Sequence, residues 1–189
     1  MSYISKIDLS TAPQEVRAAV DNHLAQGYQL TNEKLTLLHN VTAFHTLEES
    51  SYELDRELQR LIGKRAADFY EYAISLQNDC LVCSAYFSRL LEKNHIDFAT
   101  FDFTDDERLL IKNHIDFATF DFTDDERLLI EYGRAIARDP KHVPEDLMRL
   151  MQQTFTEEQL VVITTMGVFM IANNYFNDIL NVDPAPVQE

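Results

Sequence analysis

The sequence predicts an all-α protein that forms a single domain over residues 1–189, and three observations lead to this prediction. Glycine and proline are scarce, at four and five residues, so the chain has few of the tight turns that a sandwich or barrel requires. Apolar residues recur at helical spacing along most of the chain. Residues typical of helix N-termini precede several of these stretches.

Two helices are predicted in the N-terminal part. The first begins near Pro13 and ends at Gly27, and Asn32 is expected to cap a second helix that continues through His45. Their expected apolar faces are Val16, Val20 and Leu24 in the first helix, and Leu35, Leu38 and Val41 in the second.

The next stretch predicts three helices in close succession. Ser50 and Glu53 form the pattern of a capping box, and Gly63 is a stop signal for that helix. A further helix is expected over 64–76. The Asn-Asp pair at 78–79 is then expected to cap the helix that carries both cysteines of the chain.

The C-terminal part has two further capping boxes, both of the form Thr-x-x-Glu/Gln. One begins a helix over 123–138, and the other begins a long helix over 160–180. Between them, a proline opens a short helix over 144–151. The tail 183–189 is expected to be frayed.

A tandem duplication interrupts this pattern. Residues 93–111 and 112–130 are two identical copies of KNHIDFATFDFTDDERLLI. Nothing else in the chain has this period, so the repeat does not predict a solenoid. Because 19 extra residues would rotate an unbroken helix by roughly 100°, we expect the duplicated segment 93–130 to be accommodated as a loop or an extra helix. Thr123, in the second copy, is expected to cap the main helix.

The charge and hydropathy of the chain exclude several classes of function. The net charge is −16, and no lysine and arginine cluster is present that could bind nucleic acid or an anionic membrane. No run approaches the ~20 consecutive apolar residues of a membrane span, and the N-terminus lacks the core of a signal peptide. These observations predict a cytoplasmic protein without nucleic-acid or membrane partners.

The pair Cys80 and Cys83 is the strongest chemical signal in the sequence. The predicted helix N-terminus offers unpaired N–H groups and a positive dipole end, which favour thiolate over thiol. One helical turn brings the two sulfurs within bonding reach, so the pair could alternate between dithiol and disulfide. Two alternatives remain open, namely a pair of small buried side chains and half of a metal site. The metal reading lacks further ligands at suitable spacing, so we expect neither a metal nor a cofactor.

Several stretches together resemble the carboxymuconolactone decarboxylase-like superfamily, in particular its alkylhydroperoxidase D-like, peroxidase-related branch. The resemblance spans nearly the whole chain except the extra 19 residues. The stretches are AISLQNDCLVC at 73–83, TDDERLLIEY at 123–132, RDP at 138–140, FTEEQ at 155–159 and NNYFNDILNV at 173–182, with a His-Asn pair at 39–40.

This resemblance implies an all-helical bundle that assembles into a dimer, trimer or hexamer. It implies that Cys83 is the nucleophile and that Cys80 forms the disulfide with it. In the relatives, a glutamate twelve residues before the first cysteine and a histidine four residues after the second complete a proton relay.

The relay positions differ in this sequence. Asp68 replaces the glutamate, and Phe87, which cannot carry a proton, replaces the histidine. Glu71 is a possible substitute carboxylate, and His39 or His45 could supply an imidazole from another helix. The candidate catalytic residues are therefore Cys83, Cys80, Asp68 and Glu71.

The leading hypothesis is a thiol-dependent peroxidase or dithiol oxidoreductase, with a peroxide as substrate and a dithiol as reductant. It predicts a low pKa for Cys83. The alternative is a non-catalytic helical oligomer that has lost its relay histidine. A lyase or decarboxylase of the wider superfamily is disfavoured, because such members commonly lack the C-x-x-C pattern.

Overall fold

The computed structural model describes residues 2–94 and 121–184, which form helices and connecting turns without any β-strand. The prediction of an all-α fold is confirmed. Most of the duplicated segment lies outside the described residues, and so does the end of the C-terminal tail. The expectation of a loop or extra helix within 95–120, and of a frayed end at 185–189, therefore concerns residues that the structure does not describe.

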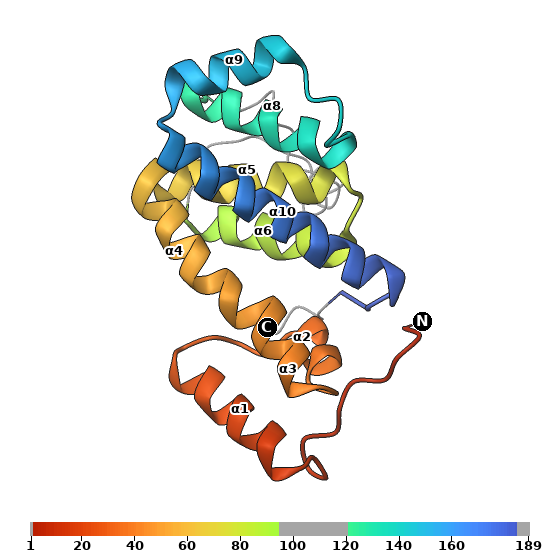
Figure 1. The fold of residues 1–189 in the computed structure, drawn as a ribbon. Coiled ribbons are helices and arrows are strands. Elements are labelled where there is room, and N and C mark those ends of the chain that lie inside the picture. The colour runs from red at the N-terminus through yellow and green to blue at the C-terminus, as the bar shows by residue number, and fades with distance from the viewer. Residues whose placement is uncertain (1, 95–120, 185–189) are drawn as a thin grey trace, which may run out of the picture.

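Three short helices form one end of the molecule (Figure 1). They are α1 (Gln14–Ala25), α2 (Asn32–Leu37) and α3 (Val41–Phe44). The single helix predicted across α2 and α3 is wrong, because Asn40 interrupts it and caps α3 by accepting a hydrogen bond from the Ala43 N–H. Leu24, expected on the buried face of α1, is exposed.

The cap of α2 also differs from the prediction. Thr31 accepts a hydrogen bond from the Lys34 N–H at 3.3 Å and is the capping residue. The Asn32 side chain instead donates to the Asp183 carbonyl at 2.9 Å. This bond ties α2 to the segment that follows α10 (Glu157–Ile179), and so fixes the N-terminal end of the molecule against the last helix.

A π-helical segment, η1 (His45–Glu49), joins α3 to α4 (Ser50–Ile62) without a break. The capping box predicted at Ser50 is wrong, because the helix has already begun before that residue and its N-cap position makes no side-chain hydrogen bond. A π turn holds one residue more than an α turn and redirects the side chains beyond it. Glu48, in this segment, is buried. Gly63 ends α4 as predicted, at φ 85°.

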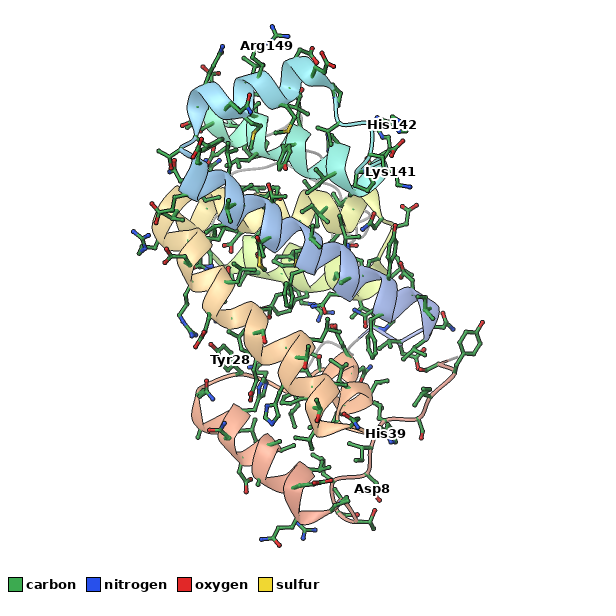
Figure 2. All side chains as sticks on the ribbon, viewed as in Figure 1. Asp8, Tyr28, His39, Lys141, His142 and Arg149 are labelled. Atoms are coloured by element: carbon green, nitrogen blue, oxygen red, sulfur yellow. The ribbon has the colours of Figure 1, made fainter. Side chains whose placement is uncertain are left out.

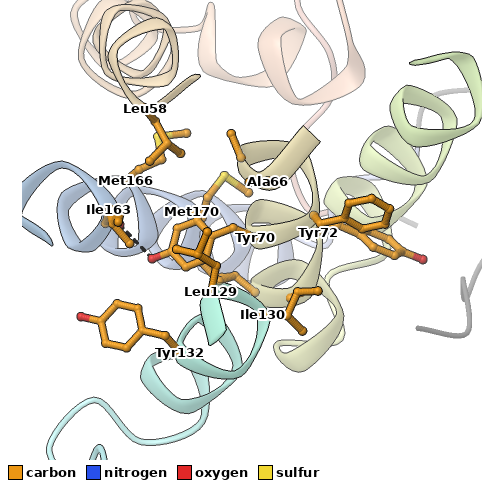
Figure 3. Packing of buried hydrophobic residues seen from close by; sticks show 14 of the residues in the cluster. Leu58, Ala66, Tyr70, Tyr72, Leu129, Ile130, Tyr132, Ile163, Met166 and Met170 are labelled. Atoms are coloured by element: carbon orange, nitrogen blue, oxygen red, sulfur yellow. Dashed lines mark hydrogen bonds between the residues drawn. The ribbon is translucent and has the colours of Figure 1, made fainter. Parts of the chain in front are cut away.

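The central helix is α5 (Lys64–Gln77), which is buried along most of its length between α4, α6 (Leu81–Asn94), α8 (Asp124–Arg138) and α10. Figure 3 shows the apolar cluster around Tyr70. The Tyr70 hydroxyl donates to the Ile163 carbonyl at 2.8 Å. Gly167 allows α10 to lie close to α5 and α8. A Cβ at this position would lie 2.3 Å from the Tyr70 hydroxyl oxygen and 2.5 Å from an Ile136 carbon.

The two C-terminal capping boxes are confirmed. Thr123 with Glu126 begins α8, and Thr156 with Gln159 begins α10, each with both reciprocal hydrogen bonds. The main helix after the duplication therefore starts in the second copy, as predicted. The helix opened by Pro144 is α9 (Glu145–Thr154), which packs against α8 at the other end of the molecule (Figure 1).

Helix α10 is longer and more apolar than the sequence suggested. Among the described residues, it alone has the length and composition of a membrane-crossing helix, with a mean hydropathy of 1.3 in its most apolar window. The prediction that no run reaches ~20 consecutive apolar residues nevertheless holds, because Thr164, Thr165, Asn173 and Asn174 interrupt the apolar residues of this helix. A core helix passes the same test, and α10 packs against α4, α5, α6, α8 and α9.

Candidate functional site

The two cysteines lie where the chain turns from α5 into α6. Asp79 has a positive φ of 55°, which ends α5, and the Cys80 N–H then bonds back to the Ser75 carbonyl at 3.1 Å. The Cys83 N–H donates to Cys80 Sγ at 3.4 Å. Cys80 itself therefore caps α6, and the prediction that 78–79 provides the cap is wrong. The placement of the dithiol at a helix start is confirmed.

The two sulfurs are close enough to share a proton. They lie 2.8 Å apart as free thiols, whereas a disulfide would require ~2.05 Å. Cys80 is fully buried and Cys83 is 6% exposed, so only a small molecule could reach them without movement of the chain.

The electrostatics of the pair differ from the prediction. The hydrogen bond from Cys83 lowers the pKa of Cys80, and the backbone N–H groups of Val82 and Cys83 lower it further. The same bond, together with burial and the charge of Glu33, raises the pKa of Cys83 well above its usual value. A low pKa was predicted for Cys83. The structure assigns it to Cys80, because the helix N–H groups converge on that sulfur.

Helix α10 supplies a third member of the site. The Asn177 Nδ2 donates to Cys83 Sγ at 3.3 Å. Its Oδ1 is buried without a hydrogen-bond partner, and so are both polar atoms of the Asn174 carboxamide one turn earlier. Orphaned buried amides are rare. The polar face of α10 therefore has unused hydrogen-bonding capacity directly beside the dithiol.

Glu33 of α2 approaches the dithiol from the N-terminal end of the molecule. The Asn177 side chain lowers the pKa of Glu33, and the charge of Glu33 interacts with both sulfurs. Burial and the neighbouring Glu48 raise the pKa of Glu33 to about 8, and its Oε1 has no partner. A protonated Glu33 carboxyl is thus the favoured form below about pH 8.

The π-helical segment η1 carries a second buried glutamate, Glu48, whose charge raises the pKa of Glu33. Glu48 accepts a hydrogen bond from the Tyr52 hydroxyl at 2.7 Å and lies 3.7 Å from the Lys34 ammonium. These two groups satisfy the buried Glu48 carboxylate. Its charge opposes ionisation of Glu33.

The two carboxylates proposed from the sequence belong to a different acidic group. Asp68 is buried and pairs with Lys64 at 2.8 Å. Glu71 is 2% exposed, and burial with the charges of Asp55 and Asp68 raises its pKa well above the usual value. The structure therefore brings Asp68 and Glu71 to each other. The carboxylates that act on the sulfurs are Glu33, on Cys83, and Asp178, on Cys80. Phe87 packs in the apolar core.

The two histidines considered as substitutes make other contacts. His39 is exposed on the surface (Figure 2), and its Nε2 lies 2.7 Å from the Ser5 carbonyl oxygen. His45 Nδ1 contacts the carboxylate of Glu49. Within the part of the chain that the structure describes, no three His, Cys, Asp or Glu side chains are arranged to hold a metal ion.

Sequence reasoning missed Glu33 and Asn177 for different reasons. Glu33 lies in the first turn of a short helix, where an acidic residue is common because it interacts with the helix dipole. Asn177, in contrast, could have been found from the sequence pattern of its helix. It and Asn174 continue the buried face of α10 beyond its apolar positions, and a polar residue on a buried face indicates a specific contact. That buried face consists of Ile163, Met166, Gly167, Met170, Asn174 and Asn177.

The described helices share an all-helical fold with solved structures of a debrominase. No family model matches the chain, and no curated protein sequence matches it either. The structure of the debrominase Bmp8 without ligand superimposes with a TM-score of 0.70 and 17% identity, over 96% of this chain and 91% of that one.

A second structure of the same relative gives the same result. A cysteine-to-alanine variant of Bmp8 in complex with 2,3,4-tribromopyrrole has a TM-score of 0.68 and 16% identity, over 95% of this chain and 90% of that one. At such low identity, the similarity establishes a shared fold over nearly the full chain.

Proposed function

We propose that this protein is a dithiol oxidoreductase of the peroxidase-related type, in which Cys83 and Cys80 reduce a small peroxide. The observation that carries the proposal is the 2.8 Å separation of two free sulfurs at the start of α6. Two thiols at this distance can close to a disulfide with little rearrangement, and the helix N-terminus stabilises the Cys80 thiolate, which takes the proton of Cys83.

Cys83 is the attacking thiol in this proposal. It retains a small exposure and contacts Asn177, while the Cys80 thiolate accepts its proton across the shared hydrogen bond. As Cys83 attacks, an S–O bond forms, the O–O bond breaks, and the alcohol leaves after taking a proton. Cys80 then attacks the sulfenic acid, so that an S–S bond forms and water leaves. Two thiols and one peroxide give a disulfide, an alcohol and water.

The test treats the reduced protein with hydrogen peroxide and measures its intact mass. The chain has only two cysteines, so intramolecular disulfide formation appears as the loss of two hydrogens. In Cys80→Ser, a dimedone adduct at Cys83 is expected. An adduct in Cys83→Ser only would reverse the assigned roles, and unreacted thiols in the native protein would refute the proposal.

The similarity to Bmp8 supports a second candidate reaction, reductive debromination of a bromopyrrole. It uses the same dithiol. The carbon–bromine bond is replaced by a carbon–hydrogen bond, bromide leaves, and the two thiols lose two electrons to become a disulfide. Incubation of the reduced protein with 2,3,4-tribromopyrrole tests this candidate, since one bromide should be released for each disulfide formed.

The alternative to both reactions is a scaffold with inert thiols. The burial of both cysteines supports it. It predicts that the folded protein's thiols stay unmodified for hours with hydrogen peroxide and react normally after unfolding. A dithiol enzyme instead reacts within minutes while folded, and a cytoplasmic dithiol reductant restores it.

We further propose that copies of this chain associate through α10. Its exposed residues fall at alternating spacings of four and three, the pattern of a coiled-coil seam. Between residues 160 and 177 they are Val161, Thr165, Val168, Ala172 and Tyr175, and beyond them Asp178 and Ile179 are exposed. No charged residue occurs between Gln159 and Asn177, although the chain has a net charge of −16. An uncharged seam on an acidic molecule favours a second copy as partner, because two such surfaces meet without like-charge repulsion.

A further inference from the structure

We infer that Glu33 is the acid–base group of the dithiol, held in place by Asn177, and that it performs the proton transfer for which Phe87 is unsuited. This inference rests on the proposed dithiol chemistry and assigns the group that supplies and removes its protons. Glu33 lies on α2, more than forty residues before the cysteines in sequence, and reaches them through the packing of the N-terminal end against α10.

The packing places Glu33 beside the end of α10 that carries Asn177, because the adjacent Asn32 side chain donates to the Asp183 carbonyl at 2.9 Å just beyond that helix. The Asn177 Nδ2 lies 3.3 Å from Cys83 Sγ. The Asn177 side chain lowers the pKa of Glu33, and the charge of Glu33 raises the pKa of Cys83. Glu33 is only 8% exposed, so bulk water cannot readily exchange its proton. One carboxylate oxygen, Oε1, is buried without a partner. That oxygen is free to hold a proton or to hydrogen-bond to a substrate oxygen.

The charged groups around Glu33 favour its protonated form. They come from several elements and comprise Glu48 of η1, Lys34 on its own helix, Cys80 before α6 and Cys83 within it. Lys34 opposes the effect of the acidic groups but is itself engaged with Glu48 and with the Gln29 carbonyl. Below about pH 8 the site therefore holds a carboxylic acid beside a dithiol in which Cys80 is the first thiol to ionise. Asp178 acts on Cys80 from α10 and raises its pKa, against the effect of Cys83 and the backbone N–H groups.

This charge state provides the protons that peroxide reduction needs. When Cys83 attacks, the leaving alkoxide takes the Glu33 proton and becomes the alcohol. The Glu33 carboxylate next accepts the proton that Cys80 carries, which frees the Cys80 thiolate to close the disulfide. The departing hydroxide takes that proton back and becomes water. The cycle ends with a disulfide and a Glu33 carboxylate, and reduction by two electrons and protons restores the starting state.

The test compares Glu33→Gln with the native protein in the rate of disulfide formation by hydrogen peroxide between pH 5 and 10. The native rate should rise as the first thiol ionises and fall above about 8, where Glu33 loses its proton. Glu33→Gln should be slower by ~10² or more and should lack the fall at high pH. Glu15→Gln is the matched control, because Glu15 is an exposed glutamate in the first turn of α1.

Further variants separate proton transfer from a structural role. Glu33→Asp should recover part of the rate and restore the fall at high pH, and Asn177→Ala should weaken both effects because it releases the carboxylate. Thermal unfolding and circular dichroism establish that each variant is folded. An unchanged pH profile in a folded Glu33→Gln would overturn the role of Glu33. If the native protein forms no disulfide with peroxide, the proposed function itself fails.

Discussion

The Cys83 backbone N–H donates a hydrogen bond to Cys80 Sγ at 3.4 Å, so the first cysteine caps the helix that carries the second. One sulfur therefore serves both the stability of α6 and the chemistry. Since N-cap hydrogen bonds contribute ~0.5–2 kcal/mol, Cys80→Ala should lower the free energy of unfolding by about 1 kcal/mol. Cys80→Ser should retain most of it, because the hydroxyl can accept the same bond. Urea denaturation under reducing conditions measures both variants, and equal losses would contradict the capping role.

The two thiols should ionise at different pH values. With one cysteine retained at a time, the rate of iodoacetamide alkylation against pH reports each pKa. The remaining Cys80 in Cys83→Ser should ionise at a lower pH than the remaining Cys83 in Cys80→Ser, because the N–H groups of α6 converge on Cys80. The opposite order would place the thiolate on Cys83 and would contradict the electrostatic description of the site.

The buried acidic residues should make the fold less stable at high pH. The pKa values of Glu33 and Glu71 are raised in the folded protein, so the folded state binds protons that the unfolded state has already lost. The stabilisation by protonated Glu33 is complete below its unfolded pKa of 4.5 and is lost as the pH rises through about 8. The melting temperature should therefore fall between pH 5 and 9. The fall should be smaller in Glu33→Gln and in Glu71→Gln, and the same slope in all three proteins would contradict this.

Close packing at Gly167 should make even one added methyl group destabilising. A Cβ there would lie 2.3 Å from the Tyr70 hydroxyl oxygen and 2.5 Å from an Ile136 carbon. Gly167→Ala should therefore lower the free energy of unfolding by ~1–3 kcal/mol, the usual cost of overpacking a core. Glu157→Gln, at an exposed position of the same helix outside the proposed interface, is the control and should have little effect. A neutral or stabilising Gly167→Ala would show that α10 can move away from α5.

A charge in the middle of the exposed face of α10 should dissociate the proposed assembly. Val168 is 58% exposed in the single chain, and Val168→Glu would bring like charges together across a seam that pairs with itself. Sedimentation velocity should give an oligomer for the native protein and a monomer for this variant. Glu15→Gln, on α1, should leave the assembly intact. A native monomer at micromolar concentration would refute the interface.

Local signals explain which parts of the fold the sequence could predict. Thr123 and Thr156 each sit three residues before a Glu or Gln, and Gly63 follows an apolar stretch, so the helix boundaries they mark depend on neighbouring residues alone. Ser50 has the same local pattern as Thr123. Its prediction failed because the preceding π turn continues the helix, and the contacts that select such a turn come from elsewhere in the structure.

The candidate site could be predicted only in part, for a related reason. Cys80 and Cys83 are neighbours in sequence, so their pairing at a helix start follows from spacing. Glu33 and Asn177 reach the sulfurs from opposite ends of the chain, and their placement depends on how α2 packs against α10. The carboxylates chosen from the sequence, Asp68 and Glu71, were sought by their spacing from the cysteines along the chain.

The most direct measurement is a redox titration of the native protein, equilibrated with mixtures of reduced and oxidised dithiothreitol or glutathione and analysed by intact mass after acid quenching. A helix-capping thiol pair with sulfurs 2.8 Å apart should give a single reversible two-electron transition between dithiol and intramolecular disulfide. Thiols that stay reduced at every potential while the protein remains folded, or that form only intermolecular disulfides, would contradict the proposed dithiol chemistry.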